Sequence, residues 1–146
     1  KAGLLVLILD GIKPILVLVI NSYFFNEYYQ NYKFLYFFIS IVGHIFPIWL
    51  TFKGGKGVAC FFGGFLIISP IPTLISMAVW MVTVKITKIS SLGALLSIFL
   101  LTSYQIVSNY GTLNKGTIFA IMLIIFWKHS DNIKRLIQGK ENKINL

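Results

Sequence analysis

Acidic side chains and cysteines are scarce in this chain of 146 residues, which has four Asp and Glu residues together and one cysteine, Cys60. A single cysteine cannot form an internal disulfide, so a disulfide scaffold is excluded. Charged residues make up 12% of the chain and hydrophobic residues 57%, with a mean hydropathy of +0.83. A water-soluble domain of this size could not hide so much apolar surface. The composition excludes intrinsic disorder and predicts an integral membrane protein.

The apolar residues fall into six runs, which predict an all-α helical bundle of about six membrane spans. Several runs are shorter than the roughly 20 residues that cross a bilayer as a helix, so flanking polar residues would enter the interface. Pro70 and Pro72 separate the third run from the fourth and indicate either a turn or a kink. We expect a single domain with a bundle at 1–128, a cytoplasmic loop at 51–58 and a cytoplasmic tail at 129–146. The runs are 2–20, 34–50, 58–69, 71–84, 92–108 and 117–127.

The basic residues, 13 Lys and Arg with a formal net charge of +9, lie between and beside the apolar runs. This placement is typical of membrane-protein loops and argues against a nucleic-acid partner. If the chain reverses at Pro70 and Pro72, ten basic residues fall on one side and only Lys33 and Lys115 on the other, while Lys13 lies within a span. Because basic loops remain cytoplasmic, the bias favours the hairpin and places the C-terminal tail in the cytoplasm. The ten are Lys1, Lys53, Lys56, Lys85, Lys88, Lys128, Lys134, Arg135, Lys140 and Lys143.

A loop with three glycines and two lysines follows the second apolar run. Glycines allow backbone N–H groups to turn towards an anion, the next helix adds the partial positive charge of its N-terminus, and lysines add full charges. The loop therefore suits a phosphate group, although it does not match the Walker A pattern. The alternative is a flexible basic loop that only sets membrane orientation. The loop residues are Lys53, Gly54, Gly55, Lys56 and Gly57.

A second polar segment follows the last apolar run. If it is helical, His129, Asn132 and 134–136 share one face. Such a face could meet the glycine loop. The alternative, which the residues alone favour, is a solvated anchor that contacts anionic lipid headgroups.

These segments, in this order and spacing, closely resemble the bacterial membrane glycerol-3-phosphate acyltransferases that use acyl phosphate as the acyl donor. The resemblance covers essentially the whole chain. That family has seven spans, and its first span and first cytoplasmic loop are expected to precede Lys1. The matching motifs are Asp10-x-x-Lys13, Gly43-His44-x-Phe46-Pro47, Phe52-Lys53-Gly54-Gly55-Lys56-Gly57-Val58-Ala59 and His129-x-x-Asn132-Ile133-x-Arg135-Leu136-x-x-Gly139-x-Glu141-x-Lys143.

The resemblance implies that an acyl group passes from acyl phosphate to glycerol 3-phosphate, giving lysophosphatidic acid for phospholipid synthesis. It implies no cofactor, and its partners are the two substrates and membrane lipids, with an enzyme that makes acyl phosphate as a further candidate. Catalytic roles would fall to Lys56, His129 and Asn132, with His129 either a general base or a positioning residue. The substrate- and phosphate-binding candidates are Lys13, His44, Lys53, Gly54, Gly55, Gly57, Arg135 and Glu141.

Other interpretations stay open at this point. Asp10 and Lys13 inside a span could mark a small transporter or channel subunit, and the chain could be an inactive remnant or a scaffold. The residues favour a mutual ion pair between Asp10 and Lys13, and a pairing of Glu141 with Lys140, Lys143 or the loop lysines. Cys60 reads as a small buried side chain. Two histidines and one cysteine, scattered along the sequence, make no recognisable metal-ligand cluster, so we expect no metal.

Overall fold

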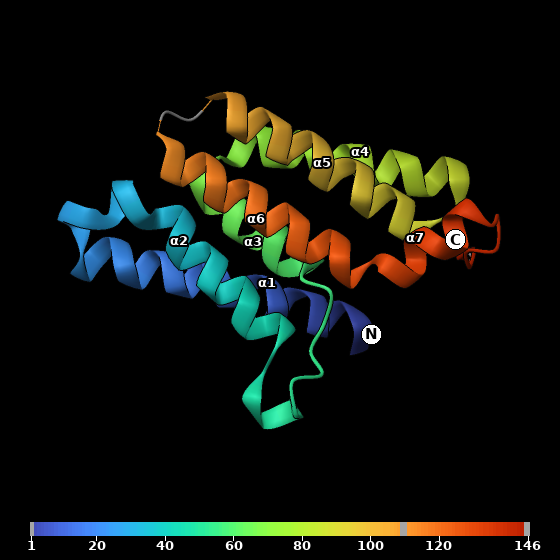
Figure 1. Cartoon of the computed structure of the whole chain (residues 1–146), viewed down its shortest axis with the longest axis horizontal. Coiled ribbons are helices and arrows are strands. Elements are labelled where there is room, and N and C mark those ends of the chain that lie inside the picture. The colour runs from blue at the N-terminus through green and yellow to red at the C-terminus, as the bar shows by residue number, and fades with distance from the viewer. Residues whose placement is uncertain (1, 109–110, 145–146) are drawn as a thin grey trace.

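The computed structural model describes residues 2–108 and 111–144, and this part of the chain is helical with connecting loops and no strand (Figure 1). The predicted all-α fold is confirmed. Lys1, which the count of basic residues includes, lies outside the described residues. The elements are α1 (Ala2–Phe24), α2 (Asn26–Ile45), the 3-10 turn η1 (Ile48–Leu50), α3 (Val58–Ile68), α4 (Pro70–Thr87), α5 (Ser90–Ser108), α6 (Thr112–Lys128) and α7 (Ser130–Ile137).

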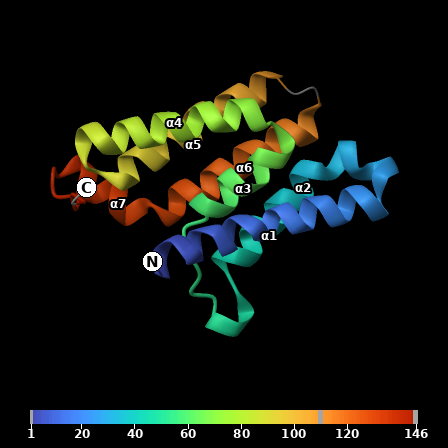
Figure 2. The same cartoon turned by 180° about the vertical axis from the view of Figure 1, so that it is seen from behind.

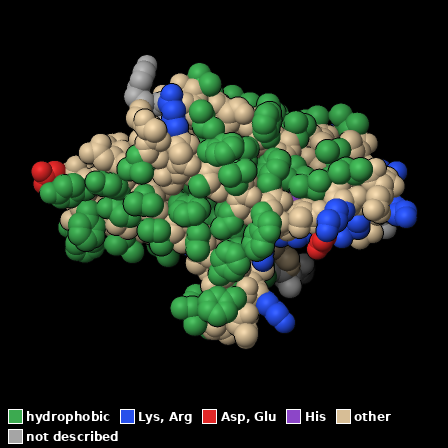
Figure 3. All heavy atoms as spheres, viewed as in Figure 1, with side chains coloured by type: hydrophobic (Ala, Val, Ile, Leu, Met, Phe, Trp, Pro, Cys, Tyr) green, Lys and Arg blue, Asp and Glu red, His purple; other side chains and the backbone are tan. Residues whose placement is uncertain are grey.

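Each of the six predicted apolar runs lies mainly in one of the helices α1 to α6. Helices α2 and α6 begin earlier than predicted, because their polar first turns are helical as well. Among the described residues, four segments are long and apolar enough to cross a membrane, while α3 and α6 are shorter, with 11 and 17 residues. Apolar side chains cover much of the visible outer surface, as a lipid-facing bundle requires (Figure 3). The four segments are Leu5–Phe24, Asn26–Leu50, Pro70–Thr87 and Ser90–Ser108.

The chain reverses direction between α3 and α4, which confirms a hairpin rather than a kink (Figure 2). The rings of Phe62 and Trp80 have centroids 6.4 Å apart. In one continuous helix, residues so far apart in sequence would be separated by about 27 Å along the axis. Pro70 opens α4, where its missing N–H costs nothing because the first helical N–H groups have no partner within the helix.

Alternating helix directions bring the glycine loop, the α4–α5 turn and α7 to the same end of the bundle as the N-terminus (Figures 1 and 2). Helices α2 and α6 begin at the opposite end (Figure 1), and Lys33 and Lys115 belong to the N-terminal halves of these helices. The described basic residues are therefore divided as the charge pattern predicted, and one polar end carries every segment in which phosphate chemistry was expected.

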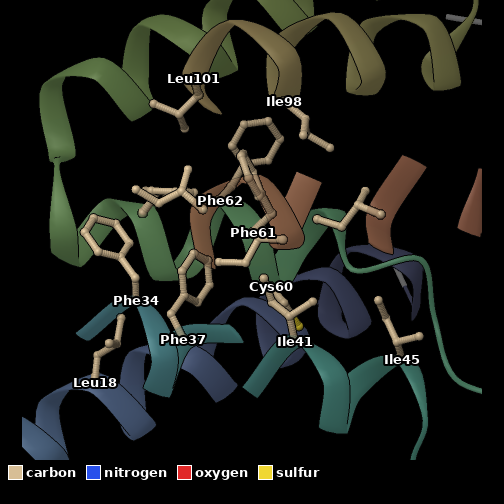
Figure 4. Packing of buried hydrophobic residues seen from close by; sticks show 14 residues of the cluster. Leu18, Phe34, Phe37, Ile41, Ile45, Cys60, Phe61, Phe62, Ile98 and Leu101 are labelled. Atoms are coloured by element: carbon tan, nitrogen blue, oxygen red, sulfur yellow. The ribbon is translucent and has the colours of Figure 1, made fainter. Parts of the chain in front are cut away.

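Phenylalanines form the centre of the bundle (Figure 4). The ring of Phe65 in α3 lies 4.8 Å from that of Phe61 and 5.0 Å from that of Phe37 in α2, both in edge-on arrangements, and all three side chains are fully buried. Ile98 and Leu101 of α5 close the cluster from the other side. This core fixes α2 and α5 around the short α3 helix.

Helices α1 and α3 approach closely at two glycines. A Cβ atom added to Gly63 would overlap the backbone of Gly11, and the thiol of Cys60 donates a hydrogen bond to the carbonyl oxygen of Asp10, 3.1 Å away. Small residues allow helix backbones to meet in a membrane, where lipid provides no hydrophobic force between helices. Cys60 is buried, as predicted.

We therefore expect Gly63→Ala to destabilise the bundle by about 1–3 kcal/mol, because the new methyl group meets backbone that cannot move aside. Gly116→Ala in α6, where an added Cβ meets nothing within 4 Å, is the matched control and should leave stability unchanged or raise it. Thermal unfolding in detergent measures both. Equal melting temperatures for the two variants would contradict the close α1–α3 contact.

Candidate active site

The glycine loop is held against the end of α2 by close backbone contacts. The amide of Gly54 donates to the carbonyl oxygen of Ile45 at 3.1 Å, and a Cβ on Gly54 would overlap the carbonyl oxygens of His44 and Ile45. A Cβ on Gly55 would overlap the imidazole of His44. Gly54 and Gly55 are thus required because the loop approaches the end of α2 too closely for side chains at these positions. The interpretation of this segment as merely a flexible basic loop is therefore not supported.

Gly57 ends the loop and caps α3 with a φ of +84°, a conformation that favours glycine. Helix α3 follows directly, so its first backbone N–H groups, which have no partner inside the helix, point towards the loop. Lys56 lies immediately before this positive helix end. The predicted arrangement of glycines and a lysine at the start of a helix is confirmed.

The tail reaches this loop through Asn132. Lys56 Nζ donates a hydrogen bond to Asn132 Oδ1 across 76 residues of sequence. Helix α6 ends at Lys128, and α7 begins after a turn at His129, which places His129 and Asn132 in the interior with 3% and 7% of their surfaces exposed. The structure therefore supports the contact between the tail face and the loop, and it does not support a fully solvated tail.

Glu141, which follows the C-terminal end of α7, accepts hydrogen bonds from three side chains. Its Oε1 accepts from Asn132 Nδ2 at 2.6 Å and from Ser91 Oγ at 2.8 Å, and its Oε2 accepts from Arg135 Nε at 2.7 Å. The expected pairing with Lys140, Lys143 or the loop lysines is wrong, because the turn after α7 directs the carboxylate towards Arg135. Burial raises the pKa of Glu141, but these hydrogen bonds and the Arg135 charge outweigh it and lower the pKa to about 2. The group is therefore an anion at neutral pH.

His129 has a defined tautomer. Its Nδ1 lies 2.8 Å from the carbonyl oxygen of Ile125, which can only accept, so Nδ1 carries the proton and Nε2 remains an acceptor. Burial lowers the pKa of His129 below its ordinary value of 6.5, with the Lys56 charge acting in the same direction. The imidazole is thus neutral at physiological pH, with Nε2 able to accept a hydrogen bond.

A second polar group lies at the α1–α2 side of the loop. Lys13 Nζ contacts Asp10 Oδ1 at 2.6 Å, which confirms the predicted ion pair, and His44 Nδ1 lies 3.5 Å from the same oxygen. The side chain of Lys13 is half exposed, whereas that of His44 is buried. Lys13, His44 and Lys53 line a groove of about 690 Å³, but in the described part of the chain no hydrogen bond joins them to Lys56, His129 or Asn132.

A second groove, of about 490 Å³, runs between α1, α3 and α4. Gly55, Lys56 and Gly57 lie at its polar end. The rest of its wall is almost entirely apolar, and both grooves border Asp10, His44 and Gly55. A cationic loop at the end of an apolar groove suits a ligand with a phosphate at the end of a hydrocarbon chain. The apolar wall includes Phe62, Leu66, Met77 and Trp80.

Sequence reasoning did not find Ser91 or the groove. Ser91 lies in the first turn of the apolar helix α5 and belongs to no recognisable motif, so only the folded chain shows that it contacts Glu141. The groove is formed by three helices whose apolar residues look like ordinary lipid-facing or core positions in the sequence. Among the described residues, no cluster of three or more His, Cys, Asp and Glu side chains could hold a metal ion.

The fold and the site define an integral membrane protein that presents a loop rich in glycine and lysine at the end of an apolar groove. The chain belongs to the glycerol-3-phosphate acyltransferase family, whose description matches residues 1–139. It is 33% identical over 147 residues to a glycerol-3-phosphate acyltransferase of Ehrlichia chaffeensis, covering 100% of this chain and 73% of that relative. It is 40% identical over 146 residues to one of Ruthia magnifica, covering 99% and 73%.

Two solved structures resemble the fold. They are crystal structures of PlsY (YgiH), described as an integral membrane glycerol 3-phosphate acyltransferase, in its glycerol 3-phosphate and lysophosphatidic acid forms. Both have a TM-score of 0.84 and cover 99% of this chain; they are 28% and 29% identical and are covered over 72% and 74% of their own lengths. The predicted family, membrane fold and enzyme class are confirmed, and the transporter interpretation is set aside.

Proposed function

We propose that this protein transfers a fatty acyl group from acyl phosphate to glycerol 3-phosphate and releases lysophosphatidic acid and phosphate. The observation that carries the proposal is Lys56, which Asn132 holds at the end of the apolar groove beside the positive end of α3. The acyl chain would occupy the groove and its phosphate the loop. The PlsY forms with glycerol 3-phosphate and lysophosphatidic acid support the same acceptor and product here.

The donor is an activated mixed anhydride, so the protein has to align the reactants and stabilise negative charge. The glycerol 3-phosphate hydroxyl oxygen forms a bond to the acyl carbon, the bond between that carbon and the bridging phosphate oxygen breaks, and the electron pair leaves with phosphate. The hydroxyl proton passes to a phosphate oxygen. Lys56 and the amides of Gly55 and Gly57 would stabilise the leaving phosphate and the developing oxyanion.

The remaining candidates take supporting parts in this proposal. Nε2 of His129 and the amide of Asn132 would orient the acceptor hydroxyl. Lys13, His44, Lys53 and Gly54 line the groove of about 690 Å³ on the α1–α2 side of the loop and would attract or hold the phosphate of the other substrate. Arg135 and Glu141 are paired with each other, so we assign them to supporting Asn132 instead of direct phosphate contact.

We also propose that the bundle and tail form one domain. The tail is tied to the α4–α5 turn by the amide of Ile144, which donates to the carbonyl oxygen of Lys88 at 2.8 Å, and to the loop by Asn132. An enzyme that produces acyl phosphate would supply the donor.

Lys56→Ala should lower kcat/KM for acyl transfer about 10–150-fold, because a charge-assisted contact worth about 1.5–3 kcal/mol is lost. The measurement is the formation of lysophosphatidic acid from acyl phosphate and glycerol 3-phosphate by purified protein. Lys115→Ala, at the opposite end of the bundle, is the matched control and should retain wild-type turnover. Wild-type kinetics for Lys56→Ala would refute the proposal, and a wild-type chain without turnover would favour the inactive alternative.

His129→Asn should retain partial activity, because Asn can still hydrogen-bond the acceptor and the donor carries its own basic oxygens. If His129 were an obligatory base, wild-type activity would fall on acidification through its pKa, below 6.5, since only the neutral ring accepts a proton. The pH–rate profiles of wild type, His129→Asn and His129→Ala decide between these roles. Loss of an acid limb together with collapse of His129→Asn at every pH would establish the base.

We further propose that the polar end of the bundle, including the C-terminus, faces the cytoplasm from the inner membrane. The basis is the concentration of basic residues at that end, which matches the usual bias of cytoplasmic loops. The opposite end, with few basic residues, would face outwards.

Single cysteines introduced in a Cys60→Ser background test this orientation. Lys53→Cys, Lys88→Cys and Asn142→Cys should react with a membrane-impermeant thiol reagent only when the cytoplasmic side is exposed. Tyr28→Cys should react from outside intact cells. The reverse pattern would invert the proposed topology, and opposite accessibility of positions 53 and 88 would contradict the α3–α4 hairpin.

A further inference from the structure

Ser91, in the first turn of α5, is joined to the candidate active site although it belongs to none of the motifs. Its hydroxyl donates to Glu141 Oε1 at 2.8 Å, and the side chain of Glu141 is only 7% exposed. The turn between α4 and α5, just before Ser91, also contacts the tail, because the Ile144 amide donates a hydrogen bond to the Lys88 carbonyl oxygen. This turn and the start of α5 therefore hold the tail at two points.

A chain of hydrogen bonds links the loop to this turn, and its donors converge on the Glu141 carboxylate from both ends. Lys56 donates to Asn132 Oδ1, and Asn132 Nδ2 donates to the carboxylate oxygen that Ser91 also contacts. An ionised carboxylate and a lysine ammonium fix the Asn132 amide from opposite sides, since the carboxylate can only accept and the ammonium can only donate. The amide cannot flip without losing both bonds. The position of Lys56 thus depends on where Glu141 Oε1 is held.

We propose that Ser91 is a positioning residue, which fixes the carboxylate of Glu141 and thereby orients Asn132 and Lys56 for acyl transfer. Arg135 donates to the other carboxylate oxygen, so without the hydroxyl of Ser91 the Oε1 oxygen keeps only its bond from Asn132, the side chain that it has to orient, among the hydrogen bonds described above. The predicted effect of Ser91 on turnover rests on the proposed function. The predicted effect of Ser91 on the placement of Lys56 is independent of that function.

Ser91→Ala should lower turnover on the order of tenfold, the effect of losing one hydrogen bond to a charged group. Ser91→Thr restores the hydroxyl and should recover most of the activity. Ser97→Ala is the matched control in the same helix, because the Ser97 hydroxyl donates to the carbonyl oxygen of Ala94 in its own helix, 2.9 Å away, and the variant should behave like wild type. Ser91→Cys, whose thiol is a weak donor, replaces the alanine variant if that variant does not fold.

A double-mutant cycle separates positioning from direct substrate contact. In an Asn132→Ala background the path from Ser91 to Lys56 is already broken, so adding Ser91→Ala should cause no further loss of turnover. A second tenfold loss in that background would show that Ser91 acts independently of Asn132, for example by touching substrate, and would overturn the proposal.

Amine labelling provides a readout without catalysis. Quantitative mass spectrometry of lysine acetylation should show Lys56 reacting severalfold faster in Ser91→Ala than in wild type, with exposed Lys53 as the internal reference and Ser97→Ala unchanged. Unchanged labelling of Lys56 would refute the positioning role. Faster labelling in a protein that has no acyltransferase turnover would uphold the positioning role and refute the proposed function.

Discussion

The hydrogen bond between Lys56 and Asn132 is the contact on which the polar end of this bundle depends. It joins a loop that precedes the buried α3 helix to a tail that follows the last apolar helix. Without it, the loop would still be held by α2 and the tail by the α4–α5 turn, but the two would lose the hydrogen bond that joins them. With it, a cation is held beside the helix N-terminus while its partner amide is itself fixed by an ionised carboxylate. The charges are arranged by neighbours, so little reorganisation is needed when an anion binds.

Close backbone approach is the second constraint, and it explains why glycines recur where helices and loop meet. Gly54 and Gly55 bring the loop onto the end of α2, and Gly63 brings α3 onto α1. The result is that Lys56 lies at the end of an apolar groove. A hydrocarbon chain in the groove and a phosphate at the loop would each meet an environment that suits them.

Much of the fold was predictable because long apolar runs in the sequence identify membrane helices. Pro70 and the distribution of basic residues together indicate that the chain reverses direction between α3 and α4. The Asp10–Lys13 pair was predictable because an isolated charge inside a span is costly. The partners of Glu141 were not, since a turn after α7 decides whether the carboxylate meets Arg135 or the lysines beside it. The contact between Ser91 and Glu141 and the apolar groove could not be predicted from the sequence either, because both are formed by segments that are distant along the chain.

The ionisation state of Glu141 determines how Asn132, and through it Lys56, is oriented. Three donors, one of which is the Arg135 cation, hold the pKa of Glu141 at about 2, so the carboxylate remains an acceptor at any pH at which the cell lives. A protonated carboxyl group would offer a donor to Asn132 and allow its amide to turn, which would present an N–H group to Lys56 in place of the oxygen. Keeping Glu141 charged therefore keeps Asn132 Oδ1 directed at Lys56. The net positive end of the bundle thus includes one buried anion that does not neutralise the loop but determines where its lysine is placed.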